Sequence, residues 1–140
     1  CGKLLRLRLP MIVATLIFFP TSHVYGAWQL VTKSPRGDTY YLDSDIETKA
    51  GVSQVWGLVD LSEAIEGSTS VKRLYQFDCV KGKLRVNQRL AFAEIGGQGK
   101  VISLETASGH WMYPDPESIN EKLVLKICFD KKENSASPKH

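Results

Sequence analysis

Asp78 and the adjacent Cys79 carry the side chains best suited to covalent chemistry in this chain. A cysteine thiolate is a nucleophile when a nearby base activates it, and His110 is the residue that could serve as that base. These three residues suggest one hypothesis, a thiol hydrolase. However, residues 71–79 have the pattern of a strand, in which adjacent side chains point to opposite faces. Asp78 and Cys79 then cannot act on the same substrate, and we expect no catalytic residue.

Cys79 and Cys128 are the two cysteines that follow the N-terminal segment. An even pair in an exported protein favours a disulfide. Cys79 also has the same parity as Tyr75 and Phe77, so it points to their apolar face. Two separate buried thiols are the alternative. We expect no metal site, because two thiols with no His or Cys partner nearby do not make a zinc site.

The first 26 residues have the layout of a secretory signal peptide. Lys3, Arg6 and Arg8 form a basic segment, and residues 9–19 are apolar. This apolar run is about 11 residues long, whereas a helix that spans a membrane needs roughly 20. We expect cleavage after Gly26 and no stable membrane insertion afterwards. An uncleaved anchor or a buried helix is the alternative.

The positive charge of the chain belongs to this N-terminal segment. The chain has 18 Lys and Arg against 15 Asp and Glu, a net charge of +3, and Lys3, Arg6 and Arg8 account for the excess. The rest of the chain is electrically balanced and gives no case for binding nucleic acid. We expect the exported protein in the periplasm or on the outer surface of a Gram-negative bacterium.

Residues 27–129 are predicted to form one α+β domain, an antiparallel meander of about six strands with a C-terminal helix packed on one face. Turn residues separate the strand-like runs. The alternation in residues 83–95 is typical of a sheet with one buried and one solvated face. The polar segment 62–70 is expected to be a flexible loop. The expected strands are residues 28–33, 39–43, 52–61, 71–79, 83–95 and 100–105.

Ser118 and Glu121 have the spacing of a capping box at the start of the predicted helix. Apolar residues then recur at helical spacing, and the helix is expected to end near Phe129. Residues 130–140 are polar without apolar periodicity and are predicted to be a disordered tail. The apolar stripe comprises Ile119, Leu123, Val124, Ile127 and Cys128.

The two predicted strands at residues 71–79 and 83–95 carry basic side chains that suggest a binding surface. Unbroken alternation would bury Leu84, Val86, Leu90 and Phe92 together and leave the basic residues as a cationic stripe on the other face. Such a stripe can bind sulfated glycans, anionic lipids or acidic protein patches; a solvated sheet face is the alternative. The loop at residues 110–113 could add an aromatic contact, although Trp111 could instead close the end of the core. The candidate binding surface comprises Lys72, Arg73, Lys83, Arg85, Arg89, His110 and Trp111.

The order of several short motifs resembles the family of exported bacterial domains named after surface-adhesin protein E. They are Trp28, the YYLD step at residues 40–43 followed by Ile46, Val55-Trp56, FDC at 77–79, WMYPDPES at 111–118, and Cys128. The resemblance implies a sheet of about six antiparallel strands whose C-terminal helix is held by a disulfide. The founding members of that family are surface adhesins that bind matrix and plasma proteins such as laminin and vitronectin, so the resemblance implies an adhesin. This chain lacks the lipid-attachment cysteine that would follow the signal in those founding members.

The leading hypothesis is an exported, non-enzymatic binding module without a cofactor, which recognises host or extracellular proteins through its surface. One alternative is a periplasmic small-ligand binder or envelope accessory protein that uses a cleft between helix and sheet, with His110 and Trp111 at its rim. A thiol enzyme is the other. An exposed edge strand could support a dimer.

Overall fold

The computed structural model describes residues 27–135, together with residues 2, 14, 15 and 17, and the side chains as far as Phe129. The predicted signal peptide lies almost wholly outside the described residues, and so do residues 136–140 of the predicted tail. In the part of the chain that is described, no helix is long and apolar enough to cross a membrane.

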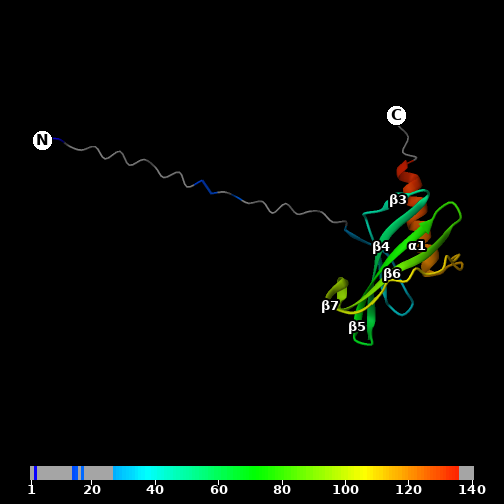
Figure 1. Cartoon of the computed structure of the whole chain (residues 1–140), viewed down its shortest axis with the longest axis horizontal. Helices are drawn as coiled ribbons and strands as arrows, with labels where there is room; N and C mark the ends of the chain where they lie inside the picture. The colour runs from blue at the N-terminus through cyan, green and yellow to red at the C-terminus, as the bar shows by residue number, and fades with distance from the viewer. Residues whose placement is uncertain (1, 3–13, 16, 18–26, 136–140) are drawn as a thin grey trace.

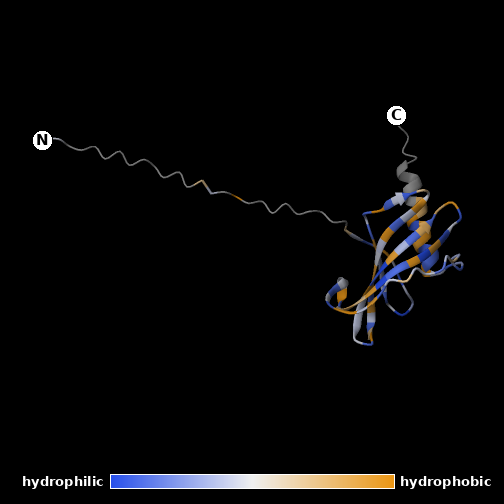
Figure 2. Ribbon diagram, in the orientation of Figure 1, coloured by the Kyte–Doolittle hydropathy of each residue, from blue (hydrophilic) through white to orange (hydrophobic). Residues whose placement is uncertain are grey.

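One antiparallel sheet forms the domain, as the alternation of apolar and polar residues along its strands predicted (Figure 1 and Figure 2), and it has seven strands where about six were expected. Its order along the sheet follows the chain, β1-β2-β4-β5-β6-β7, while the short β3 pairs with β4. Short turns connect the strands, and apart from β3, which pairs with β4 alone, each strand lies beside its neighbour in sequence, which is the meander expected. The bounds are β1 Trp28–Lys33, β2 Thr39–Asp43, β3 Glu47–Lys49, β4 Val52–Ile65, β5 Ser68–Asp78, β6 Lys83–Glu94 and β7 Gln98–Glu105, with a 3-10 turn η1 at Ile95–Gly97.

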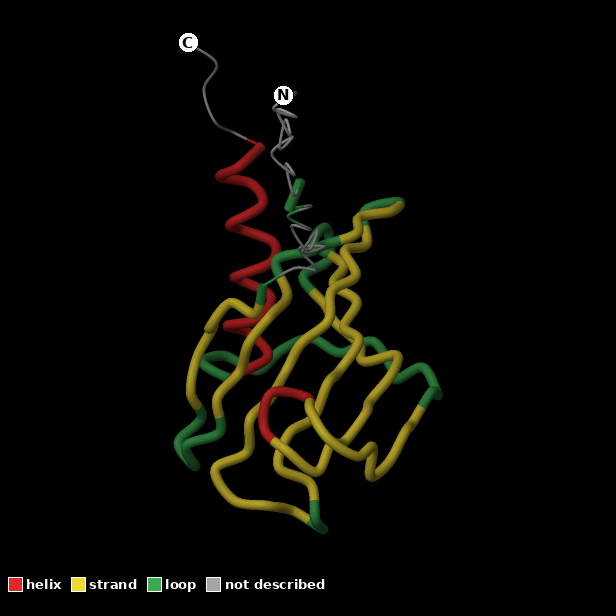
Figure 3. The backbone as a smooth tube through the Cα atoms, turned by 90° about the vertical axis from the view of Figure 1, so that its left-hand side faces the viewer, coloured by secondary structure: helices red, strands yellow, loops and turns green. Residues whose placement is uncertain are grey.

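A single helix, α1 (Ile119–Ser135), packs across one end of the sheet (Figure 3). It begins where the capping box predicted, since the Ser118 hydroxyl accepts a hydrogen bond from the Glu121 amide at 3.2 Å. The predicted end near Phe129 is wrong, and residues 130–135 of the predicted tail are helical. These residues contain neither Gly nor Pro, and once a helix is nucleated each further residue adds a backbone hydrogen bond.

Replacing Ser118 by Ala removes the acceptor for the Glu121 amide. We expect the free energy of unfolding to fall by about 1 kcal/mol, the usual effect of losing a helix N-cap. The measurement is urea denaturation followed by far-UV circular dichroism. The matched variant Ser118→Asp keeps an acceptor and should retain wild-type stability; equal losses in both variants would contradict a capping role.

The core lies between α1 and the face of the sheet that it covers, which we call the helix face. The apolar stripe of the helix is buried there, as predicted, with Leu123 only 1% exposed and Ile127 3% exposed. Because facing side chains fill this interface, the cleft between helix and sheet that a small-ligand binder would need is occupied by the core. The core cluster consists of Leu42, Val55, Tyr75, Phe77, Leu84, Leu123, Val124, Ile127 and Cys128.

A β-bulge in β6 divides the strand into two halves with opposite alternation. Tyr75 pairs with Val86 but the preceding Leu74 pairs with Gln88, so Asn87 is the extra residue. A bulge of this kind reverses which side chains face the core from that point on. The predicted common face of Leu84, Val86, Leu90 and Phe92 is therefore wrong. Leu84 and Val86 pack in or against the helix-face core, whereas Leu90 and Phe92 lie on the other side, which we call the opposite face.

Residues 62–70 form the end of a hairpin rather than the predicted flexible loop. β4 runs to Ile65, β5 begins at Ser68, and these two residues pair. Glu66 and Gly67 between them have φ values of 50° and 82°, the left-handed pair that a two-residue hairpin turn requires. The hairpin projects from the sheet at the end away from α1 (Figure 1).

Candidate functional site

Cys79 and Cys128 form a disulfide between β5 and α1, as the sequence predicted, with a Cα–Cα distance of 5.4 Å. A bridged cysteine has no thiolate, so the thiol-enzyme hypothesis is wrong for this state of the protein. The carboxylate of Asp78 instead accepts hydrogen bonds from the Val80 and Lys81 amides at 3.1 and 3.0 Å, and it shapes the turn into β6. His110 is exposed. Among the described residues, no group of three or more His, Cys, Asp or Glu side chains could hold a metal ion.

The predicted cationic stripe is split between the two faces of the sheet. Arg73 and Arg89 are cross-strand partners, and both have the parity of the helix face. Lys72 lies on the opposite face because it is adjacent to Arg73 in an extended strand. Lys83 and Arg85 also lie on the opposite face, because the bulge at Asn87 separates their alternation from that of Arg89.

Arg73 is a half-buried cation at the end of the core. Its guanidinium donates a hydrogen bond to the Tyr75 hydroxyl at 3.3 Å. Burial acts to lower the pKa of Arg73, but interactions with the Tyr75 and Tyr40 hydroxyls outweigh it and raise the pKa above its usual value. Arg73 therefore stays charged, with its guanidinium held beside these two tyrosines.

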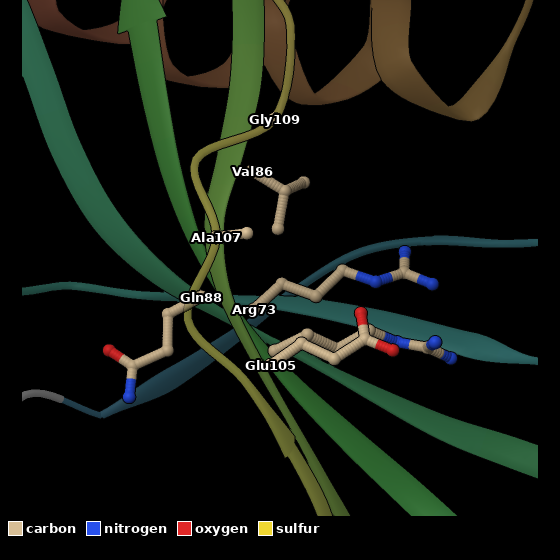
Figure 4. A pocket seen from close by; sticks show the side chains of 7 residues that line it. Arg73, Val86, Gln88, Glu105, Ala107 and Gly109 are labelled. Atoms are coloured by element: carbon tan, nitrogen blue, oxygen red, sulfur yellow. The ribbon is translucent and has the colours of Figure 1, made fainter.

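Glu105 completes a row of charges across three strands, because it pairs with Arg89 as Arg89 pairs with Arg73. Directly opposed like charges destabilise a sheet, and the carboxylate on the far side of Arg89 offsets that effect. Figure 4 shows Arg73 and Glu105 extending in the same direction, while Gln88 points away. These three residues also line a hollow of about 400 Å³.

A second hollow, of about 430 Å³, lies on the helix face where α1 does not cover the sheet. Arg36, Arg73 and Arg89 line it together with three carboxylates, Asp38, Glu66 and Glu105. Asp38 is already committed, since it accepts hydrogen bonds from the Ser62 amide at 2.9 Å and the Ser62 hydroxyl at 3.1 Å. Equal numbers of positive and negative groups give this hollow no net charge.

Trp111 lies beside Lys83 and Arg85 on the opposite face and is not part of the core cluster. The Arg85 guanidinium carbon is 4.5 Å and the Lys83 ammonium 5.1 Å from the centroid of the Trp111 ring. Both contacts are cation–π interactions. The structure therefore brings together three residues of the predicted surface, while Arg73 and Arg89 lie on the helix face.

Trp28 and Trp56 lie on the opposite face as well, so all three tryptophans of the chain are outside the core cluster. Trp28, Trp56 and Phe92 line a hollow of about 330 Å³ around Lys72. The Lys72 ammonium is 5.8 Å from the Trp28 ring and 5.3 Å from the Phe92 ring. Trp56 was not among the predicted surface residues, although period-two parity could have placed it on this face, opposite to Val55.

The sequence of the domain matches that of a known protein family. The family described as surface-adhesin protein E matches residues 28–129, which is nearly the whole of the described chain. The chain belongs to the surface-adhesin protein E family. A search of curated proteins found none similar to this chain.

Solved structures of Haemophilus influenzae protein E have the same fold as this member of the surface-adhesin protein E family. Crystal form II matches with a TM-score of 0.63 and 18% identity, covering 80% of this chain and 94% of that chain. Protein E from non-typeable H. influenzae matches with a TM-score of 0.62 and 18% identity, covering 84% of each chain. At this identity the likeness shows the fold alone.

Proposed function

We propose that the domain is an exported, non-enzymatic binding module that recognises host or extracellular proteins through its surface. The observation that carries the proposal is the match to the surface-adhesin protein E family across residues 28–129. The family resemblance points to matrix or plasma proteins as the class of partner. The outer cell surface is the location at which such partners can be reached.

The distribution of side chains supports a function in binding. The helix face is filled by the core and tied by the Cys79–Cys128 disulfide. The opposite face carries tryptophans beside cations, and Trp and Arg are the residue types that contribute most to protein interfaces. We propose that Lys72, Lys83, Arg85 and Trp111 contact the partner, with the exposed His110 at the margin.

The location can be tested on intact cells of the bacterium that produces the protein. Antibodies against the purified domain are expected to label intact cells nearly as strongly as cells whose outer envelope has been permeabilised, because an adhesin must be exposed. An antibody against a periplasmic enzyme is the control for leakage. Labelling that requires permeabilisation would contradict the adhesin proposal, since the domain could not reach a host protein.

A further inference from the structure

A groove of about 370 Å³ lies on the opposite face between β3 and the segment that carries Trp111. One register row crosses its floor: Glu47 pairs with Gln54, Gln54 with Gln76, and Gln76 with Arg85. This volume is at the lower end of the roughly 300–1,000 Å³ usual for small-molecule sites. The groove is therefore large enough for one ligand unit of modest size.

Hydrogen bonds between side chains fix this row. The Gln76 amide nitrogen donates to the Gln54 oxygen at 3.1 Å, and the Arg85 Nε donates to the Gln76 oxygen at 2.7 Å. The amide nitrogen of Gln54 and the two terminal nitrogens of Arg85 are not used in these bonds. They give the floor of the groove planar donors whose orientation is already set.

Trp111 is fixed beside the row by the backbone. Met112 and Leu84 exchange two hydrogen bonds, of 3.0 and 2.9 Å, so residues 109–112 run along β6 as an additional strand would. This pairing holds Trp111 against Arg85, and the ring is half-buried. The aromatic wall of the groove is thus preorganised in the same way as its floor.

One side of the groove is basic. The contacts of Arg85 are neutral, namely the Trp111 ring and the Gln76 amide oxygen, and Lys83, which pairs with Asp78 across the strands, also lies over the ring. The lining carries one net positive charge, from Arg85 and Lys49 against Glu47. Arginine with free terminal nitrogens is suited to bidentate binding of a carboxylate or sulfate.

We propose that this groove binds an acidic glycan, a sugar ring that carries a carboxylate or a sulfate. The acidic group binds Arg85 and Lys83, the apolar face of the sugar packs against the part of Trp111 that these two cations leave uncovered, and sugar hydroxyls accept hydrogen bonds from Gln54 and Arg85. The inference rests on the proposed binding function and names a ligand class for it. An acidic peptide would engage the cations but would leave the amide row without the several hydroxyls that a sugar offers.

The test is calorimetric titration of the protein, purified after export, with three hexasaccharides. These are a heparin fragment, which is sulfated, a hyaluronan fragment, which carries carboxylates alone, and a neutral N-acetylglucosamine hexamer. We expect the protein to bind at least one acidic hexamer and to bind the neutral hexamer at least tenfold more weakly. Binding of the heparin fragment alone assigns the anion as sulfate, and binding of the hyaluronan fragment assigns it as carboxylate. Failure to bind either acidic hexamer would overturn the proposal.

Arg85→Gln tests the placement of the site, and Arg36→Gln is its charge-matched control. Arg36 is exposed and lies at the hollow on the helix face. We expect Arg85→Gln to weaken binding of the acidic hexamer about tenfold or more, and Arg36→Gln to leave it unchanged. If the two variants weaken binding equally, binding depends on the net charge of the protein and not on this groove, and the proposed site is wrong. Gln54→Ala, which changes no charge, should weaken binding several-fold and serves if Arg85→Gln unfolds.

Two further measurements separate the classes of partner. Poly-glutamate that binds as tightly as the acidic hexamer would overturn a glycan ligand, because charge alone would suffice. Binding to matrix proteins stripped of their glycans is measured in parallel. If the protein binds the stripped matrix proteins but no glycan, the inference fails and the proposed function stands. If it binds the acidic hexamer but not the stripped matrix proteins, the inference stands and the proposed protein partners are wrong.

Discussion

Replacing both Cys79 and Cys128 by Ala is expected to lower the free energy of unfolding by about 4 kcal/mol. The two residues are 49 positions apart, and the chain-entropy model assigns a loop of that length about this stabilisation. The whole net stability of a domain this size is about 5–15 kcal/mol. The loss should appear as a fall in Tm on the order of 15 °C, measured by thermal denaturation with circular dichroism.

Wild-type protein in reductant is the matched control for this prediction. Reduction should destabilise the wild type by a similar amount and should leave the double variant unchanged. A variant that unfolds at the wild-type temperature would contradict the role of the disulfide in holding α1 on the sheet. Loss of stability in the variant on adding reductant would point to some other effect of the reagent.

Gly57→Ala is expected to destabilise the domain by about 2 to 3 kcal/mol, near the upper end of the usual effect of overpacking a core. Gly57 is buried in β4, and a Cβ there would lie 2.9 Å from Cδ2 of the Tyr75 ring and closer still to its Cε2. The ring cannot move aside freely, because Tyr75 is 2% exposed and its hydroxyl holds Arg73. The measurement is the urea midpoint at constant m-value.

A double-mutant cycle tests the cause of that loss. In a Tyr75→Val background the ring is absent, and the same Gly57→Ala change should cost much less. The two substitutions would then be strongly non-additive. Additive effects would show that the cost of the methyl group arises from something other than the contact with Tyr75.

The disulfide was predicted from the even pair of cysteines in an exported protein, together with local periodicity. Cys79 directly follows β5 and continues the parity of Tyr75 and Phe77, and Cys128 belongs to a helical stripe that has to be buried. Both inferences depend on local periodicity alone, and no irregularity separates these residues. The pairing, the order of the strands and the start of α1 at Ser118 could therefore be predicted.

Parity failed in β6, where the bulge at Asn87 reverses the alternation. Gln88 is the one departure from alternation beside Asn87, and it did not reveal the bulge because Arg89 continues the polar series and Leu90 the apolar one. The bulge is set by tertiary contacts: the Val86 carbonyl accepts a hydrogen bond from the Gly109 amide at 2.8 Å. The Asn87 side-chain oxygen is buried without a hydrogen-bond partner among the described residues.

Two other features were not predicted correctly. Residues 62–70 are polar, yet they pair as the end of a hairpin because backbone hydrogen bonds and the Glu66-Gly67 turn suffice there. The row of Gln54, Gln76 and Arg85 was missed for a different reason. Its members come from three strands, and only the register of β4, β5 and β6 shows that they are neighbours.

Binding of the purified protein to immobilised matrix and plasma proteins, including laminin and vitronectin, tests the proposed adhesin function. We expect saturable binding to at least one of them, absent from serum albumin, and weakened by Arg85→Gln but not by Arg36→Gln. Binding to every immobilised protein no greater than binding to albumin, at several salt concentrations, would contradict the claim that this domain acts as an adhesin.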